Sequence, residues 1–161
     1  MKALSDTIIF EIRNKLLNSD VIRKLLYYNT ADALSKSAPS KQLAKPHLSI
    51  SPLEFMDEGD NQKLANFIVV YIPTIDFSYE STTNNIVIDI LVDREQWELD
   101  ENKLRLYQLV NEVARLLNKQ KLSSAGQLEL IDATYILVEG RFLGYQLSID
   151  VLEERLENEF Y

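Results

Sequence analysis

Few residues in this chain could do chemistry, and their spacing fits no catalytic pattern. His47 is the single histidine and there is no cysteine. One imidazole excludes a pair of histidine metal ligands, and the absence of cysteine excludes a thiolate nucleophile and a cysteine zinc site. We therefore expect His47, in the segment AKPHLSI, to be structural.

Two acidic stretches could bind a cation or exchange protons. The sequence DEGD at 57–60 offers carboxylate oxygens, but the spacing differs from that of a calcium loop. The connector DREQWELD at 93–100 holds pairs of carboxylates, yet nothing in it predicts desolvation, so helix capping explains them better. The four glycines form no phosphate-binding loop. We expect no catalytic residue, no metal and no cofactor, and hence no enzyme.

Charge is unevenly distributed along the 161 residues, whose net charge is −8. Residues 1–48 carry 8 Lys or Arg against 4 Asp or Glu (net +4), whereas residues 49–161 carry 9 against 21 (net −12). The basic part could complement an acidic partner or a neighbouring copy, or it could be solvated surface. No dense basic cluster predicts DNA binding, and no apolar run is long enough to cross a membrane, so we expect a soluble protein.

Hydrophobic periodicity places the elements that would position any site. Apolar residues at helical spacing predict helices at 5–18 and 21–28, with Ser19 and Asp20 as the cap of the second helix. Alternation predicts paired strands at 66–73 and 84–92. A helix is expected over 100–119, capped by Asp100 with Glu101 in its first turn, and two or three strands between 126 and 151.

The pattern predicts one α+β domain over 1–161, with a mainly antiparallel sheet packed by one long helix. N-terminal helices occupy 1–34, and the sheet with the long helix occupies 65–161. Residues 35–64, rich in Pro, Ser and Lys, are expected as a long irregular arm, either a binding arm or a disordered excursion.

The order of these segments resembles a known family. FIVVYIP, NIVIDILVD, LRLYQLVNEVARLLN, LSSAGQLELIDA and GYQLSIDV follow one another between about 67 and 151, and this series is similar to the tail terminator (tail completion, head–tail joining) proteins of tailed bacteriophages. The resemblance implies a structural virion protein. It would form a homo-oligomeric ring, usually of six copies, that ends growth of the tail tube and joins the tail to the neck proteins.

Further expectations follow from the resemblance. Partners would be other copies, the tail-tube protein and neck or connector proteins. DNA would pass through the ring without specific binding, no membrane would be involved, and the protein would reside in the virion neck and, during assembly, the host cytoplasm. The expected interface residues lie in the arm and at a hairpin tip: Lys41, Lys45, Pro46, Tyr79, Glu80, Thr82 and Asn84.

Alternative functions remain open from the sequence. Another phage neck protein, such as a head-completion stopper or a connector adaptor, is the main alternative. A cellular adaptor without a phage context is a second.

Overall fold

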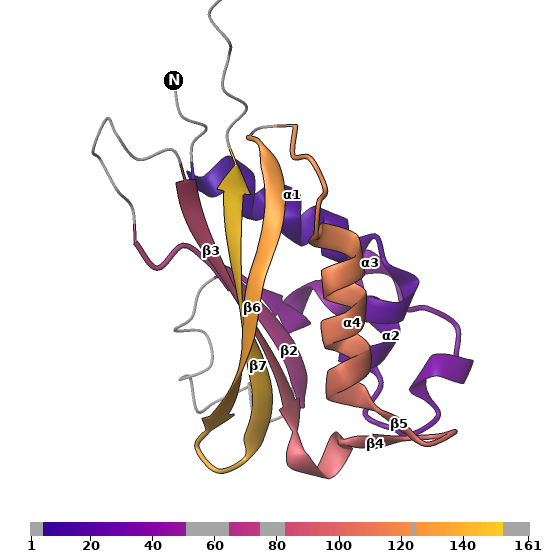
Figure 1. The fold of residues 1–161 in the computed structure, drawn as a ribbon. Coiled ribbons are helices and arrows are strands. Elements are labelled where there is room, and N and C mark those ends of the chain that lie inside the picture. The colour runs from indigo at the N-terminus through magenta and orange to yellow at the C-terminus, as the bar shows by residue number, and fades with distance from the viewer. Residues whose placement is uncertain (1–4, 51–64, 75–82, 124, 153–161) are drawn as a thin grey trace, which may run out of the picture.

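The computed structural model describes residues 5–50, 65–74, 83–123 and 125–152. Within them the fold is α+β, as predicted, with a five-stranded sheet that carries helices on one face (Figure 1). The main elements in chain order are α1 (Ser5–Leu17), α2 (Asp20–Tyr27), α3 (Lys41–Ala44), β1 (Leu48–Ser49), β2 (Asn66–Tyr71), β3 (Thr83–Asp93), β4 (Glu98–Leu99), β5 (Lys103–Leu104), α4 (Arg105–Leu117), β6 (Gln127–Val138) and β7 (Phe142–Leu152).

The large sheet has the strand order β1-β2-β3-β7-β6. Strand β3 pairs antiparallel with both β2 and β7, and β6 pairs antiparallel with β7. The predicted pairing of the strands near 66–73 and 84–92 is thus confirmed. Strand β1 differs, because it lies parallel to β2 and makes the sheet mixed. The two edges of the sheet are therefore a two-residue strand, β1, and a twelve-residue strand, β6.

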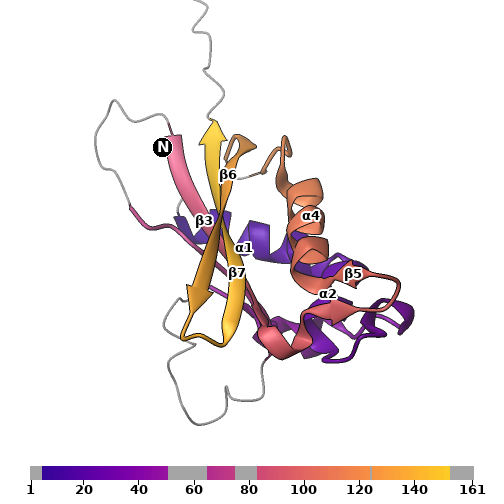
Figure 2. The same cartoon turned by 60° about the horizontal axis from the view of Figure 1, so that its bottom comes forward.

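The core lies between the sheet and the helices. Helices α1, α2 and α4 lie on the same side of the sheet in both views (Figures 1 and 2). Alternate residues of the central strands face them, among them Ile88 of β3, which pairs with Leu147 of β7. The face of α4 that packs on this layer buries Leu106, Leu109, Val113 and Leu117. Apolar alternation in the strands and helical spacing in α4 thus meet in one core.

The start of α2 confirms the predicted cap. The hydroxyl of Ser19 accepts a hydrogen bond from the backbone N–H of Ile22 at 3.2 Å. The same hydroxyl donates to the carboxylate of Glu112 in α4 at 2.8 Å. The Arg115 guanidinium beside that carboxylate lowers the pKa of Glu112. Ser19 therefore satisfies the helix end and ties α2 to α4.

The start of α4 corrects a prediction. The helix begins at Arg105, and Asp100 does not cap it. Glu101 and Asn102 have φ of 61° and 57°, which a right-handed helix excludes, and they form the turn between β4 and β5. The N–H of Arg105 donates to the carbonyl of Trp97 at 2.9 Å. The polar run that resembled a helix cap is therefore a hairpin turn, in which Asp and Asn are also common.

Residues 35–50, expected as the first part of an irregular arm, form short elements that pack on the rest of the fold. Helix α3 is followed by a 3-10 helix, η2 (Lys45–His47), which leads into β1. Ala44 and Leu48 belong to the hydrophobic core, and their burial anchors this segment between α2 and the sheet. The remainder of the predicted arm, 51–64, lies outside the described residues.

Candidate functional site

The outer side of β6 is the first candidate interaction surface. Strand β6 pairs with β7 on one side. On its other side, residues 118–121 hydrogen-bond to the first part of β6 up to Leu130, and from Ile131 onwards no described strand pairs with it. Ile131, Tyr135 and Leu137 are 52–57% exposed although all three are large and apolar. A long edge strand with exposed apolar side chains is a preferred place for contact with another chain.

Two acidic residues accompany these side chains. Asp132 lies next to Ile131, and Glu139 follows the end of β6 in the turn to β7. Both are exposed, and their carboxylates make no ion pair or hydrogen bond with a described residue. We call Ile131, Asp132, Tyr135, Leu137 and Glu139 the edge patch, because all five lie on the free part of the edge strand or in its turn. Tyr135 and Leu137 lie opposite Tyr145 and Leu143 on the face of the sheet that carries the helices, and Asp132 lies opposite Ser148 on the other face. Its chemistry suits a partner surface that combines apolar and basic groups.

A row of aromatic rings connects the edge patch to the first turn of α4. The ring centroids of Trp97 and Tyr107 are 5.9 Å apart, those of Tyr107 and Tyr145 are 6.0 Å apart, and those of Tyr145 and Tyr135 are 6.0 Å apart. Hydrogen bonding to Tyr107 raises the pKa of Tyr145. Rows of Tyr and Trp that are only partly covered are typical of protein interfaces, because each ring offers apolar area and a polar group.

Local backbone features shape the hairpin that presents the edge patch. The register of β6 against β7 shifts between Leu130 and Asp132, which leaves Ile131 as the extra residue of a β-bulge. Glu139 and Gly140 have φ of 53° and 65°, and the N–H of Arg141 donates to the carbonyl of Val138 at 3.2 Å. Two left-handed residues in succession are what a tight hairpin turn requires.

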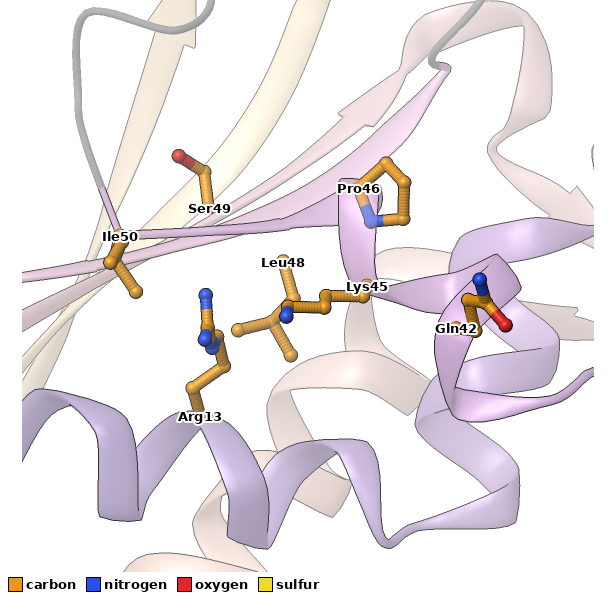
Figure 3. Close-up of a pocket in the computed structure, with 7 residues that line it drawn as sticks. All are labelled: Arg13, Gln42, Lys45, Pro46, Leu48, Ser49 and Ile50. Atoms are coloured by element: carbon orange, nitrogen blue, oxygen red, sulfur yellow. The ribbon is translucent and has the colours of Figure 1, made fainter.

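A basic pocket lies on a different part of the molecule (Figure 3). It has a volume of about 320 Å³ and lies between α1 and the segment from α3 to Ile50. In Figure 3 the side chain of Arg13 rises from α1 towards β1, and Lys45 extends from η2 towards the same space. The lining residues are Arg13, Gln42, Lys45, Pro46, Leu48, Ser49 and Ile50.

A second pocket, of about 480 Å³, adjoins the first and shares Arg13, Gln42 and Lys45 with it. Lys41 is added there, together with residues of α1. The ammonium groups of Lys41 and Lys45 are exposed and make no ion pair or hydrogen bond with a described residue. Nε of Arg13 is buried without a hydrogen-bond partner. Three cations therefore line two adjoining hollows whose described lining contains no anion, and this suits carboxylate groups from outside.

The structure thus brings together three of the residues expected at an interface. Lys45 and Pro46 line the first pocket, and Lys41 lines the second. Tyr79, Glu80 and Thr82 lie outside the described residues, and Asn84 lies in β3 at the position paired with Val151 of β7. The pairing of Asn84 within the sheet does not identify a partner protein.

Sequence reasoning missed Arg13 and the edge patch. In the sequence Arg13 is a single cation on an amphipathic helix, far along the chain from Lys45. Only the fold places the two side chains at the same pocket. The edge patch had a signal in the run YILV at 135–138, where apolar residues occupy both faces of the strand instead of alternating with polar ones. Such a run is unusual for a strand whose outer side has no partner.

Two further titratable residues, His47 and Asp93, make contacts within the fold. His47 is buried with Nδ1 at 2.9 Å from the carbonyl of Asn66, and burial lowers its pKa. The carboxylate of Asp93 accepts hydrogen bonds from the N–H of Glu95 at 3.0 Å and from Nε of Arg141 at 2.7 Å.

Across the described residues, no group of three or more His, Cys, Asp or Glu is arranged to hold a metal ion. No helix in that part of the chain has the length and apolar character needed to cross a membrane.

Comparison with known proteins gives one family. The model of the YomW family matches residues 19–151. No curated protein matches the chain. Among solved structures, a crystal structure of a protein from Akkermansia muciniphila is similar at 16% identity, with a TM-score of 0.34, over 91% of this chain and 74% of that one.

Proposed function

This chain belongs to the YomW family, a phage-derived family, and is a phage-associated protein; from that premise we propose that it is a structural virion protein, the tail terminator. In this role several copies form a ring at the head-proximal end of the tail tube. The ring ends growth of the tube and joins the tail to the neck. The resemblance of residues 67–151 to tail terminator proteins supports this role within the phage context.

The proposal includes the partners of the ring. They are other copies of this chain, six in all by the resemblance, the tail-tube protein and the neck or connector proteins. DNA passes through the ring without specific binding, and the net charge of −8 supports this, because acidic walls do not retain phosphates. The protein acts without catalysis or a cofactor. It resides in the virion neck and, before that, in the host cytoplasm.

The edge patch is the observation that carries the proposal. A protein that acts alone has no use for three large apolar side chains that are more than half exposed on one edge strand. A protein that assembles has a direct use for them, because a neighbouring copy would cover them.

Electron microscopy and native mass spectrometry test the proposal. We expect rings of uniform size, or caps on tube ends with tube length arrested, when the protein is mixed with tail-tube protein. Tubes that stay uncapped while the protein binds the portal would overturn the terminator role in favour of a stopper or adaptor. A strict monomer that binds neither tube nor portal would overturn the assembly role.

A matched pair of variants tests the part played by the edge patch. Leu137→Lys places a charge in the patch, and Leu152→Lys places the same charge on an exposed apolar residue at the end of β7. We expect Leu137→Lys to abolish rings and Leu152→Lys to retain them, with equal far-UV circular dichroism. Rings from both variants would show that the patch is not a subunit contact.

A further inference from the structure

The edge patch and the basic pocket lie at opposite ends of the same sheet. The patch belongs to β6, and the pocket is lined by β1, the other edge in the order β1-β2-β3-β7-β6. A surface on one end of a protein cannot reach a surface on the other end within the same copy. The edge patch of one copy can reach the basic pocket of a neighbouring copy, so each surface is available to a second copy.

The two surfaces carry complementary charge. The edge patch contributes the carboxylates of Asp132 and Glu139, which pair with no described residue, and the pocket contributes Arg13, Lys41 and Lys45 without a described anion partner. This division follows the chain, since the basic residues belong to the segment 1–48 and the acidic ones to 49–161. Complementary potentials favour encounter and fix the register of two surfaces.

Apolar side chains accompany the charges on both sides. Next to the pocket, Phe10 of α1 is 42% exposed and Leu43 of α3 is 52% exposed. The ring of Phe10 lies under the guanidinium carbon of Arg13, 4.9 Å from the ring centroid, which places it beside the basic pocket. The surface around the basic pocket therefore offers positive charge and apolar side chains, which match the carboxylates and the apolar side chains of the edge patch.

We propose that the edge patch of one copy docks on the basic pocket of the next copy in the ring. The occupant of the pocket is thus a second copy of this chain, and the carboxylates of its edge patch lie among the three cations. The contact is heterologous, with a different surface from each copy, and repetition of such a contact closes into a ring when the rotation allows it. This inference rests on the proposed ring and specifies its subunit interface.

Charge reversal on each side tests the contact. Lys41→Glu with Lys45→Glu reverses the pocket, and Asp132→Lys with Glu139→Lys reverses the patch. All four side chains are exposed, so both double variants should fold, which circular dichroism and thermal melting verify. We expect each double variant alone to lose ring formation, by native mass spectrometry and on tail tubes.

Mixing the two double variants is the decisive step. An acidic pocket then meets a basic patch, and a basic pocket meets an acidic patch, so every contact around an alternating ring is restored. We expect the equimolar mixture to form rings that contain both variants in equal number. The control variant Glu98→Lys with Asp100→Lys makes the same charge change on exposed carboxylates of β4 and its turn, and it should form rings alone.

The failures of the two proposals are distinguishable. Rings from either double variant alone would overturn this interface while leaving the terminator ring intact. Folded double variants that fail alone and also fail when mixed would overturn direct contact between the two surfaces. Failure of the unsubstituted protein to form rings or cap tubes would overturn the proposed function, and this inference with it.

Discussion

Replacement of Arg105 by methionine should destabilise the fold strongly. The guanidinium is fully buried and donates to three backbone carbonyls, those of Leu25 at 2.6 Å, Gln96 at 2.9 Å and Thr30 at 2.9 Å. No described carboxylate pairs with it, and burial lowers its pKa to about 10, so it stays charged at pH 7. It joins α4 to the end of α2 and to the segment before β4.

The magnitude follows from these three bonds. A hydrogen bond to a charged group is worth about 1.5–3 kcal/mol, and the gain from no longer burying the guanidinium offsets part of the loss. We expect Arg105→Met to lower the free energy of unfolding by about 3–5 kcal/mol, close to the cost of breaking a buried ion pair. For a domain of this size the melting temperature should fall by roughly 2–4 °C per kcal/mol.

Urea unfolding followed by circular dichroism measures this change. Arg105→Lys is the control, because lysine keeps the charge but has one nitrogen and cannot reach three separated carbonyls. We expect it to fall between the unsubstituted protein and Arg105→Met. A methionine variant within about 1 kcal/mol of the unsubstituted protein, with an unchanged urea slope, would refute the view that these bonds hold the elements together.

Three further predictions concern the sheet, the helix cap and pH. Gly144→Ala should disrupt the β3–β7 pairing at a cost of about 3 kcal/mol, because its Cβ would clash with the backbone carbonyl oxygen of Ile90; a melting temperature equal to that of the unsubstituted protein would contradict this. Ser19→Ala should cost about 1–2 kcal/mol in urea unfolding, since both the cap of α2 and the bond to α4 are lost; Ser19→Thr, which keeps the hydroxyl, is its control. Because burial lowers the pKa of His47 below 6.5, the unfolded chain binds the proton more readily, and the free energy of unfolding should fall as pH drops below about 6.5, by at most about 1.4 kcal/mol per unit. His47→Gln should lack this part of the pH dependence, and equal slopes for the two proteins between pH 7.5 and 5.5 would contradict the assignment.

Local sequence signals predicted those elements whose stability comes from their own side chains. The cap at Ser19, the apolar spacing of α1 and α2, and the alternation in β2 and β3 are all visible within a few residues of the chain. The start of α4 was not visible in this way. Asp100, Glu101 and Asn102 suit a helix cap and a tight turn equally well, and the backbone contact between Arg105 and Trp97 decides between them.

The candidate surfaces were predictable only in part, for a related reason. Lys41, Lys45 and Pro46 could be singled out by composition, whereas their meeting with Arg13 depends on how α1 lies across β1. The edge position of β6 depends on the strand order, which alternation does not determine. Long-range arrangement, rather than residue type, is the information that the sequence pattern lacked.

The two edges of the sheet also indicate how neighbouring copies would meet. Strand β1 has only two residues, and Leu48 and Ser49 are both buried, so it offers no length of backbone for β6 of another copy to extend. A heterologous contact between the two ends must therefore be made mainly by side chains. Side-chain contacts between charged groups weaken in salt, since the screening length falls to about 3 Å at 1 M. If the proposed interface is correct, the fraction of protein in rings free of tail tubes should fall as salt rises to 1 M, because the charged part of the contact is screened, whereas a ring joined by continuous β-pairing would show no such fall.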